Sequence, residues 1–161
     1  MKKIIHFLLL GLIINACGES KPSQKQTTSK TEQNSEEELS TNIVINSDDT
    51  MEFDKNILLI PAGKKITLTL NHNGRFPKVG MGHNFVLLKA DTNVSEFAEK
   101  AAMARKTDYI PEGDQTIAYT KLLGGGESDT ITFDAPKKGY YTFLCTFPGH
   151  WQLMKGKLIV K

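Results

Sequence analysis

Residues 143–154 read Phe-Leu-Cys-Thr-Phe-Pro-Gly-His-Trp-Gln-Leu-Met, a pattern typical of a strand followed by a tight turn. The strand delivers Cys145, and the Pro-Gly pair then turns the chain so that His150 comes back toward the cysteine. Met154 follows four residues later. The spacing Cys-x4-His-x3-Met therefore puts a thiol, an imidazole and a thioether at one end of a strand.

A second histidine stands far upstream, in Met81-Gly82-His83-Asn84, at the start of another predicted strand. With the C-terminal segment it completes a set of one thiolate, two imidazoles and one thioether. This set matches the trigonal copper site of two histidines and one cysteine with a weak axial methionine. Zinc prefers a firmer fourth ligand, and copper(II) outranks zinc in the affinity order of divalent metals.

Taken singly, each of these residues has an ordinary structural explanation. A lone cysteine is usually a small buried hydrophobe, a histidine beside a turn is usually only hydrogen-bonded, and a methionine fills core space. Their combination on an all-β pattern favours a metal site instead. An unpaired cysteine is a liability in an oxidising compartment, so Cys145 in an exported protein indicates a chemical role.

Short strands alternate with Gly, Pro, Asn and Asp turns after residue 41. In the segment 65–70, Ile66, Leu68 and Leu70 alternate with threonines and so share one face. Further strands are predicted at 43–45, 51–53, 57–60, 83–88, 116–119, 130–133, 140–144 and 157–160. Strands of this length and spacing predict an all-β fold, an antiparallel sandwich or barrel.

One segment breaks this pattern and predicts a single short inserted helix. Residues 95–105 are rich in Ala, Glu and Lys, which favour helices. Asn93 and Glu96 have the spacing of a capping box at its start. We expect the inward face of this helix to consist of Phe97, Ala101, and Ala102 or Met103.

The N-terminus is predicted to be a targeting signal followed by a tether. Residues 1–16 contain two lysines and an apolar run about half the roughly 20 residues that span a bilayer, as in a signal peptide. The run ends at Ala16-Cys17, which resembles a bacterial lipoprotein cleavage box, so Cys17 is expected to carry lipid. An uncleaved anchor and an ordinary signal peptide are the alternatives. Residues 17–40 read as a flexible polar tether, and 41–161 as the folded domain.

Length and charge limit the class of protein. The chain has 161 residues, enough for one ordinary hydrophobic core. Its 20 Lys and Arg and 18 Asp and Glu give a net charge of +2, which argues against nucleic acid as a partner. Cys17 and Cys145 are the only cysteines, so neither a disulfide framework nor a zinc site of three or four cysteines is available.

The two metal-site segments resemble those of the azurins, of the cupredoxin family. The similarity covers roughly residues 43–161 and includes the stretches 119–124 and 128–134. It implies a cupredoxin-like Greek-key β-sandwich that binds one type 1 copper ion, cycling between Cu(I) and Cu(II). It implies an electron carrier of the cell envelope rather than an enzyme, since no open coordination position is evident.

The resemblance also implies roles for individual residues. By similarity, the copper ligands are His83, Cys145 and His150 in the equatorial plane, with Met154 and the Gly82 carbonyl as axial contacts. Asn84 matches a residue that ties the two ligand loops together, and the backbone N–H of Phe147 matches a donor to the thiolate sulfur. Electrons are expected to pass through the edge of His150. The apolar docking patch around that edge is expected to consist of Met81, Phe147, Pro148, Gly149, Trp151 and Leu153.

The same resemblance implies partners, but this sequence differs from azurins at positions that bear on stability and docking. The family implies redox partners such as c-type cytochromes or copper and haem reductases, and we expect a monomer held at a membrane through Cys17, with its domain in the periplasm or on the cell surface. The azurin disulfide has no counterpart here, and Phe85 stands where azurins bury a tryptophan. Trp151 and Gln152 replace small residues on the docking face, which alters it and leaves an electronic role for Trp151 open.

Two other functions compete with electron transfer. Periplasmic copper storage or delivery is the nearer one, but such sites expose clusters of Met or His, and the five methionines here are dispersed. A copper oxidase or nitrite reductase domain needs further histidine-rich sites, and only three histidines follow Cys17. One of them, His72, resembles a non-ligand histidine of azurins. It is either pH-sensitive near neutrality or simply hydrogen-bonded beside Asn73-Gly74.

Overall fold

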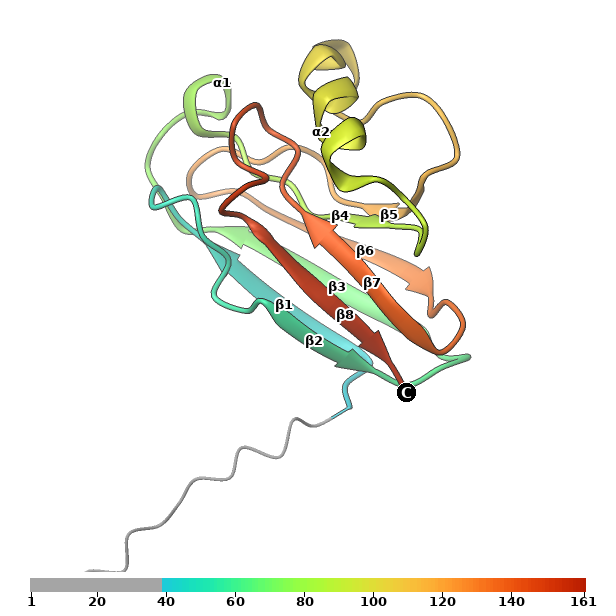
Figure 1. Ribbon diagram of the computed structural model, residues 1–161. Coiled ribbons are helices and arrows are strands. Elements are labelled where there is room, and N and C mark those ends of the chain that lie inside the picture. The colour runs from blue at the N-terminus through green and yellow to red at the C-terminus, as the bar shows by residue number, and fades with distance from the viewer. Residues whose placement is uncertain (1–38) are drawn as a thin grey trace, which may run out of the picture. The chain divides into compact units, whose positions relative to one another are not determined.

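Residues 39–161 are described by a computed structural model, in which two β-sheets pack face to face (Figure 1). The strands are β1 (Asn42–Ser47), β2 (Ile57–Ile60), β3 (Lys65–His72), β4 (Val86–Leu88), β5 (Thr116–Tyr119), β6 (Ser128–Asp134), β7 (Gly139–Leu144) and β8 (Lys155–Val160). The helices are α1 (Lys78–Met81), α2 (Val94–Met103) and the short 3₁₀ helix η1 (Arg105–Thr107). One sheet has the order β1-β3-β6 and the other β2-β8-β7-β4-β5, so the cupredoxin-like fold is a sandwich and not a closed barrel.

The core lies between the sheets and follows the alternation predicted for β3. Ile66, Leu68 and Leu70 are fully buried, and the threonines between them are partly exposed. They share one cluster with Phe143 of the opposite sheet and with Phe85, which directly precedes β4. Each such side chain contributes about 2 kcal/mol through burial, so the sandwich has an ample core without a disulfide.

Two strand pairs differ from the antiparallel expectation. β1 pairs with β3 in parallel, and β2 pairs with β8 in parallel, whereas the other pairs are antiparallel. Parallel neighbours cannot be joined by a tight hairpin. Accordingly β2, which lies between β1 and β3 in sequence, belongs to the other sheet. All six residues of β1 are in register with β3, which ties the first strand to the sandwich through the main chain.

The predicted strand at 51–53 is wrong. This segment is a turn, joined to β1 only by a bridge between Ser47 and Phe53. Met51 has a φ of 60°, a left-handed conformation that cannot continue a strand. The predicted strand at 83–88 is also shorter, because only Val86–Leu88 forms β4 and His83 makes a single bridge to Leu123.

Helix α2 begins with the predicted cap, since the Asn93 side chain accepts hydrogen bonds from the N–H groups of Ser95 and Glu96. Its buried residues are Phe97, Ala98 and Ala101. They pack on Val86, Leu88 and Leu144, which face away from the core of the sandwich. Met103 is 87% exposed, so the alternative that placed it on the inward face is wrong; it lies in the last turn of α2, beyond the buried residues. Within residues 39–161 no helix is long and apolar enough to cross a membrane.

Three strands end or begin at the same end of the sandwich, which is uppermost in Figure 1. β3 ends at His72, β4 begins two residues after Asn84, and β7 ends directly before Cys145. The four-residue helix α1, which the sequence did not predict, and the loop between β7 and β8 lie at this end. The topology thus places the candidate ligands together.

Candidate metal centre

Three side chains offer metal-binding atoms at one buried point. His83, Cys145 and His150 present ligand atoms that all lie within 4.8 Å of one another. The Cys145 sulfur is 3.9 Å from His83 Nδ1 and 3.8 Å from His150 Nδ1, and the two nitrogens are 3.2 Å apart. Both histidines and the cysteine are buried. The fold therefore brings together two imidazole nitrogens and one sulfur from segments more than 60 residues apart.

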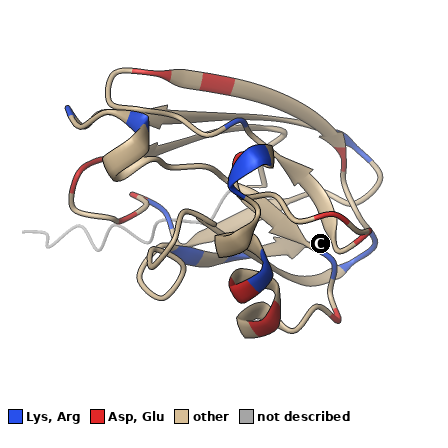
Figure 2. Ribbon diagram, turned by 90° about the horizontal axis from the view of Figure 1, so that it is seen from above, with Lys and Arg blue, Asp and Glu red and all other residues tan. Residues whose placement is uncertain are grey.

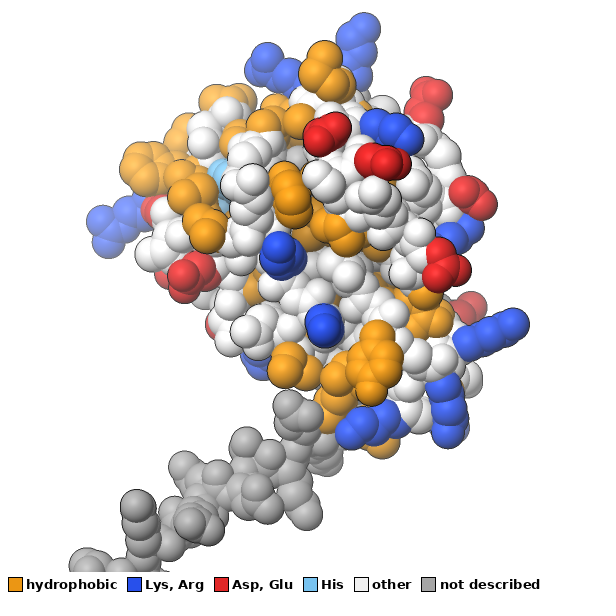
Figure 3. All heavy atoms as spheres, in the orientation of Figure 1, with side chains coloured by type: hydrophobic (Ala, Val, Ile, Leu, Met, Phe, Trp, Pro, Cys, Tyr) orange, Lys and Arg blue, Asp and Glu red, His pale blue; other side chains and the backbone are white. Residues whose placement is uncertain are grey.

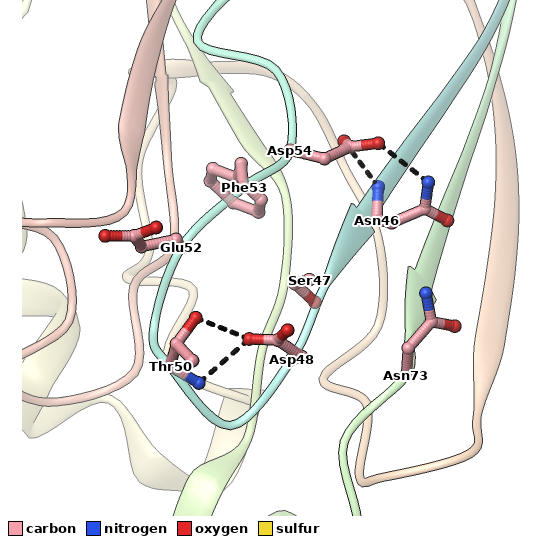
Figure 4. Close-up of a pocket in the computed structure, with 8 residues that line it drawn as sticks. All are labelled: Asn46, Ser47, Asp48, Thr50, Glu52, Phe53, Asp54 and Asn73. Carbon is pink, nitrogen blue, oxygen red and sulfur yellow. Dashed lines mark hydrogen bonds between the residues drawn. The ribbon is translucent and has the colours of Figure 1, made fainter. Parts of the chain in front are cut away.

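The orientation of His83 is set by the turn after β1. Its Nε2 donates to the Asp48 carbonyl at 2.9 Å, which leaves Nδ1 free to face the cysteine. Figure 4 shows this turn: the Asp48 carboxylate accepts from the backbone N–H and the hydroxyl of Thr50. The Thr50 side chain, followed by its backbone N–H, holds the pKa of Asp48 below its ordinary value. The turn is thus fastened by its own hydrogen bonds while its carbonyl orients a ligand.

The same turn encloses a small polar pocket of about 150 Å³ beside the centre. Figure 4 shows its lining, which includes the carboxylates of Glu52 and Asp54. Asp54 accepts from the backbone and side-chain amides of Asn46. These bonds close the turn against β1 and account for the polar lining.

Consecutive backbone hydrogen bonds shape the loop between β7 and β8. The N–H of His150 donates to the Phe147 carbonyl, that of Met154 to the His150 carbonyl, and that of Cys145 to the Met154 carbonyl. Gly149 has a φ of 85°, which this turn requires and which a side chain would disfavour. Met154 is fully buried, and its backbone is bonded directly to that of Cys145. The predicted turn is therefore a compact, internally bonded loop.

Gly82 also lies close to the candidate metal centre. Its carbonyl oxygen is 3.9 Å from the Cys145 sulfur. A Cβ at this position would lie 2.7 Å from the Lys78 carbonyl oxygen and 3.0 Å from the Leu122 side chain. Only glycine permits this approach, so α1 and the Leu122 side chain together press the residue before His83 toward the sulfur.

Asn84 joins the two loops. Its Nδ2 donates to the Thr146 hydroxyl at 2.8 Å, and its Oδ1 accepts from the Thr146 backbone N–H, also at 2.8 Å. Asn84 and Thr146 are both buried and each follows a candidate ligand in sequence. This bonding holds His83 and Cys145 in a fixed relation.

Burial governs the protonation of the three candidate ligands. It raises the pKa of Cys145 to about 11, although the backbone N–H groups of Asn84 and Phe147 act in the opposite direction. Burial lowers the pKa of His83 to about 4 and also lowers that of His150. Both imidazoles are therefore neutral at pH 7, the state in which they bind metals, and the thiol must release its proton to solvent when it binds a metal.

His72 packs against His83, one of the candidate ligands. Its ring centroid is 4.2 Å from that of His83, and the residue is only 1% exposed. The Gly74 N–H donates to its Nδ1 at 3.1 Å, and its Nε2 donates to the Met81 carbonyl at 2.8 Å. One neutral tautomer thus satisfies both nitrogens, which is the hydrogen-bonded explanation considered from the sequence.

Some residues of the expected docking patch are exposed, and others are partly buried. Leu153 is 63% exposed, and Pro148 and Gly149 are exposed beside it. Trp151 instead packs against the α2 cluster, with the Lys155 Nζ 5.3 Å from its ring centroid. Met81 and Phe147 are partly buried. Trp151 therefore lies toward the side of the domain and not on the outermost rim.

Two further apolar side chains, one in α1 and one shortly before it, were not singled out from the sequence. Phe76 is 54% exposed and Val79 is 77% exposed. The signal was available, because both are large apolar residues in an otherwise polar and Gly-rich segment that leads to Gly82. Figure 3 shows hydrophobic side chains gathered around a small area of histidine surface at this end. Cys17, the remaining predicted site residue, lies outside the described residues.

The fold and the donor set define a copper protein of the cupredoxin class with one copper ion. A family model for copper binding proteins of the plastocyanin/azurin family matches residues 39–161. The chain belongs to this family.

Individual relatives agree with this assignment. Outer membrane protein H.8 of Neisseria gonorrhoeae is 44% identical over 118 residues, covering 71% of this chain and 64% of that protein. The chain thus spans less than two thirds of that relative's length. An azurin of Alcaligenes faecalis is 39% identical over 121 residues, covering 72% of this chain and 94% of that protein. The crystal structure of reduced auracyanin from Roseiflexus castenholzii superimposes with a TM-score of 0.71 at 38% identity, covering 77% of this chain and 99% of that one.

Proposed function

We propose that this chain is a type 1 copper electron-transfer protein of the bacterial cell envelope. The observation that carries the proposal is the buried cluster of two imidazole nitrogens and one cysteine sulfur within 4.8 Å. A bound copper ion supplies one-electron chemistry between Cu(I) and Cu(II). His83, Cys145 and His150 would hold the ion, and Met154 and the Gly82 carbonyl would be weaker contacts to it.

The residues around the cluster favour electron transfer over catalysis. The Gly82 carbonyl lies close to the Cys145 sulfur. Met154 is buried, and its backbone carbonyl accepts a hydrogen bond from the Cys145 N–H. We propose that, with copper bound, these residues leave no open position for a substrate. His150 is 4% exposed, whereas His83 is fully buried, so the His150 edge is the route by which an electron enters and leaves.

Rigidity supports the same function. A carrier exchanges electrons quickly when its ligands need little rearrangement between the two oxidation states. His83 is held by the Asp48 carbonyl, and Asn84 and Thr146 hold the two ligand loops together. These bonds keep the ligands in one geometry without the help of the metal.

We propose that the partners are redox proteins, such as c-type cytochromes or copper and haem reductases, that dock at the His150 edge. The exposed apolar side chains Phe76, Val79 and Leu153 suit a small and transient interface. Around this end Lys and Arg are interspersed with Asp and Glu, without a single basic face for nucleic acid (Figure 2). We propose that the protein acts as a monomer.

The envelope location rests on the N-terminal sequence and on a relative. One 44% identical relative is named as an outer membrane protein. We propose that residues 1–16 are removed as a lipoprotein signal, that Cys17 carries lipid, and that 17–40 tether the copper domain 41–161 to the membrane. Mass spectrometry of the purified mature protein tests this: a lipidated Cys17 at the N-terminus supports it, and a Cys17→Ala variant should leave the membrane fraction.

The central test is spectroscopic. The purified chain is loaded with copper(II), its visible and electron spin resonance spectra are recorded, and it is then reduced and reoxidised. An intense blue thiolate-to-copper band, narrow hyperfine splitting and reversible bleaching are expected. A pale protein that yields its copper readily to a chelator would contradict the proposal and favour copper storage or delivery.

A further inference from the structure

A third loop reaches the copper end, besides the two loops that carry the proposed ligands. It joins α2 to β5 and contains Asp108 and Tyr109. Both residues have a left-handed backbone, with φ of 53° and 63°. This conformation is unfavourable for residues other than glycine, and a bulky side chain in it must be held by its surroundings. Two such residues in succession call for a structural explanation.

The two left-handed residues contact the two ligand loops separately. The Asp108 carbonyl accepts a hydrogen bond from Asn84 Nδ2 at 3.2 Å. The Tyr109 ring meets the Phe147 ring edge-on, with centroids 5.3 Å apart and planes at 70°. The Tyr109 N–H donates to the Ala104 carbonyl at 2.9 Å, which fixes the turn from within. The strained backbone therefore aims a carbonyl at one loop and a ring at the other.

Phe147 connects Tyr109 to the metal centre. Its ring centroid is 4.7 Å from that of His150, and its backbone N–H acts to lower the pKa of Cys145. A side chain that fixes Phe147 thus influences two proposed ligands at once. Tyr109 is partly buried, and one of its neighbours is this same ring.

We infer that Tyr109 is a positioning residue for electron transfer, which keeps Phe147 packed on His150 and so limits the movement of the ligand loop between oxidation states. The inference rests on the proposed function and adds a third loop to the two that bind copper. The left-handed backbone of Asp108 and Tyr109 holds the Tyr109 ring in place. Loss of the ring leaves the ligands present but less rigidly held.

The test compares Tyr109→Ala with Tyr109→Phe in the copper-loaded chain. The electron self-exchange rate is measured by NMR line broadening in mixtures of the oxidised and reduced forms, together with the hyperfine splitting and the reduction potential. Tyr109→Ala should slow exchange about three- to tenfold, since an edge-on aromatic pair is worth that factor in a barrier. Tyr109→Phe keeps the ring and should exchange like the wild type. Tyr140→Ala is the matched control, because Tyr140 lies on β7 and is 71% exposed.

Several outcomes would overturn the inference. Unchanged exchange and spectra in Tyr109→Ala would do so, even with lower thermal stability, because Tyr109 would then be only structural. Equal slowing by Tyr109→Phe would also do so, because the ring would not be what matters. If Tyr109→Ala does not fold, Tyr109→Leu replaces it under the same criteria. A wild-type chain without the blue band marks a failure of the proposed function instead, and is recorded first.

Discussion

The copper end of this molecule has an interior and a rim that are held in different ways. In the interior, His83 is held by the Asp48 carbonyl of the turn after β1, and the Cys145 backbone is held by that of Met154 across the loop between β7 and β8. On the rim, Leu153 and Val79 expose 63% and 77% of their surface. The centre is thus held by contacts from several segments, whereas the side chains of the proposed docking surface are largely exposed. Replacing interior residues should change the metal site, and replacing rim residues should change only encounters with partners.

The largest effect is expected from Cys145→Ser. A hydroxyl does not supply the thiolate that gives a blue copper site its colour and softness. The variant should lose the visible band completely while the fold is kept, as checked by absorption and circular dichroism. Met154→Leu is the control, since it removes only the weaker thioether ligand of the proposed set and should keep a blue band with a shifted reduction potential.

Next in size is Asn84→Ala, which removes the tie between the two loops. The buried Thr146 N–H and hydroxyl both lose their partner, so the free energy of unfolding should fall by about 3 kcal/mol. The hyperfine splitting should widen as the ligands lose their fixed relation. Denaturant unfolding of the metal-free protein checks the first part. Asn73→Ala, at an exposed position, should change neither quantity, and equal effects from both variants would contradict the comparison.

The stability of the metal-free protein should also depend on pH through a buried residue of the interior. The pKa of His83 is about 4 in the folded chain because of burial, against 6.5 ordinarily. The unfolded chain therefore binds more protons between these values, and stability is lost as the pH falls from about 6.5 to about 4. The expected loss is roughly 2–3 kcal/mol, measured by denaturant titration at each pH. His83→Gln should flatten this dependence, and an undiminished slope in that variant would assign it to another group.

The smallest effect on the protein itself is expected from Leu153→Glu on the rim. An exposed substitution should change stability by less than about 0.5 kcal/mol and leave the copper spectrum as it was. Self-exchange needs two copies to meet at this face, so the added charges should slow it about tenfold, and less so in high salt. Tyr140→Glu places the same charge on an exposed residue of β7 and should leave the rate unchanged. Equal slowing by both would show that the rim is not the meeting face.

Much of the fold could be read from local patterns. The alternation in β3 and the Asn93 cap of α2 depend on neighbours in sequence, and both are observed as predicted. Predictions whose outcome depended on contacts between distant residues were wrong more often. Residues 51–53 have a strand-like composition, but Met51 is left-handed because the turn must close against β1. Met103 follows a helical period, yet α2 ends there and leaves it exposed.

The site shows the same division between sequence and tertiary structure. By itself the sequence determined which donors are present and the short spacing from Cys145 to His150 and Met154, because a tight turn joins them covalently. Only the tertiary structure decided that His83, 62 residues before Cys145, comes within 3.9 Å of its sulfur. It also decided which nitrogen of His83 faces the centre, through a carbonyl from the turn after β1, and it turned Trp151 toward α2. Spacing along the chain limits only near neighbours, whereas these contacts arise when the two sheets pack and bring separate strand ends to one place.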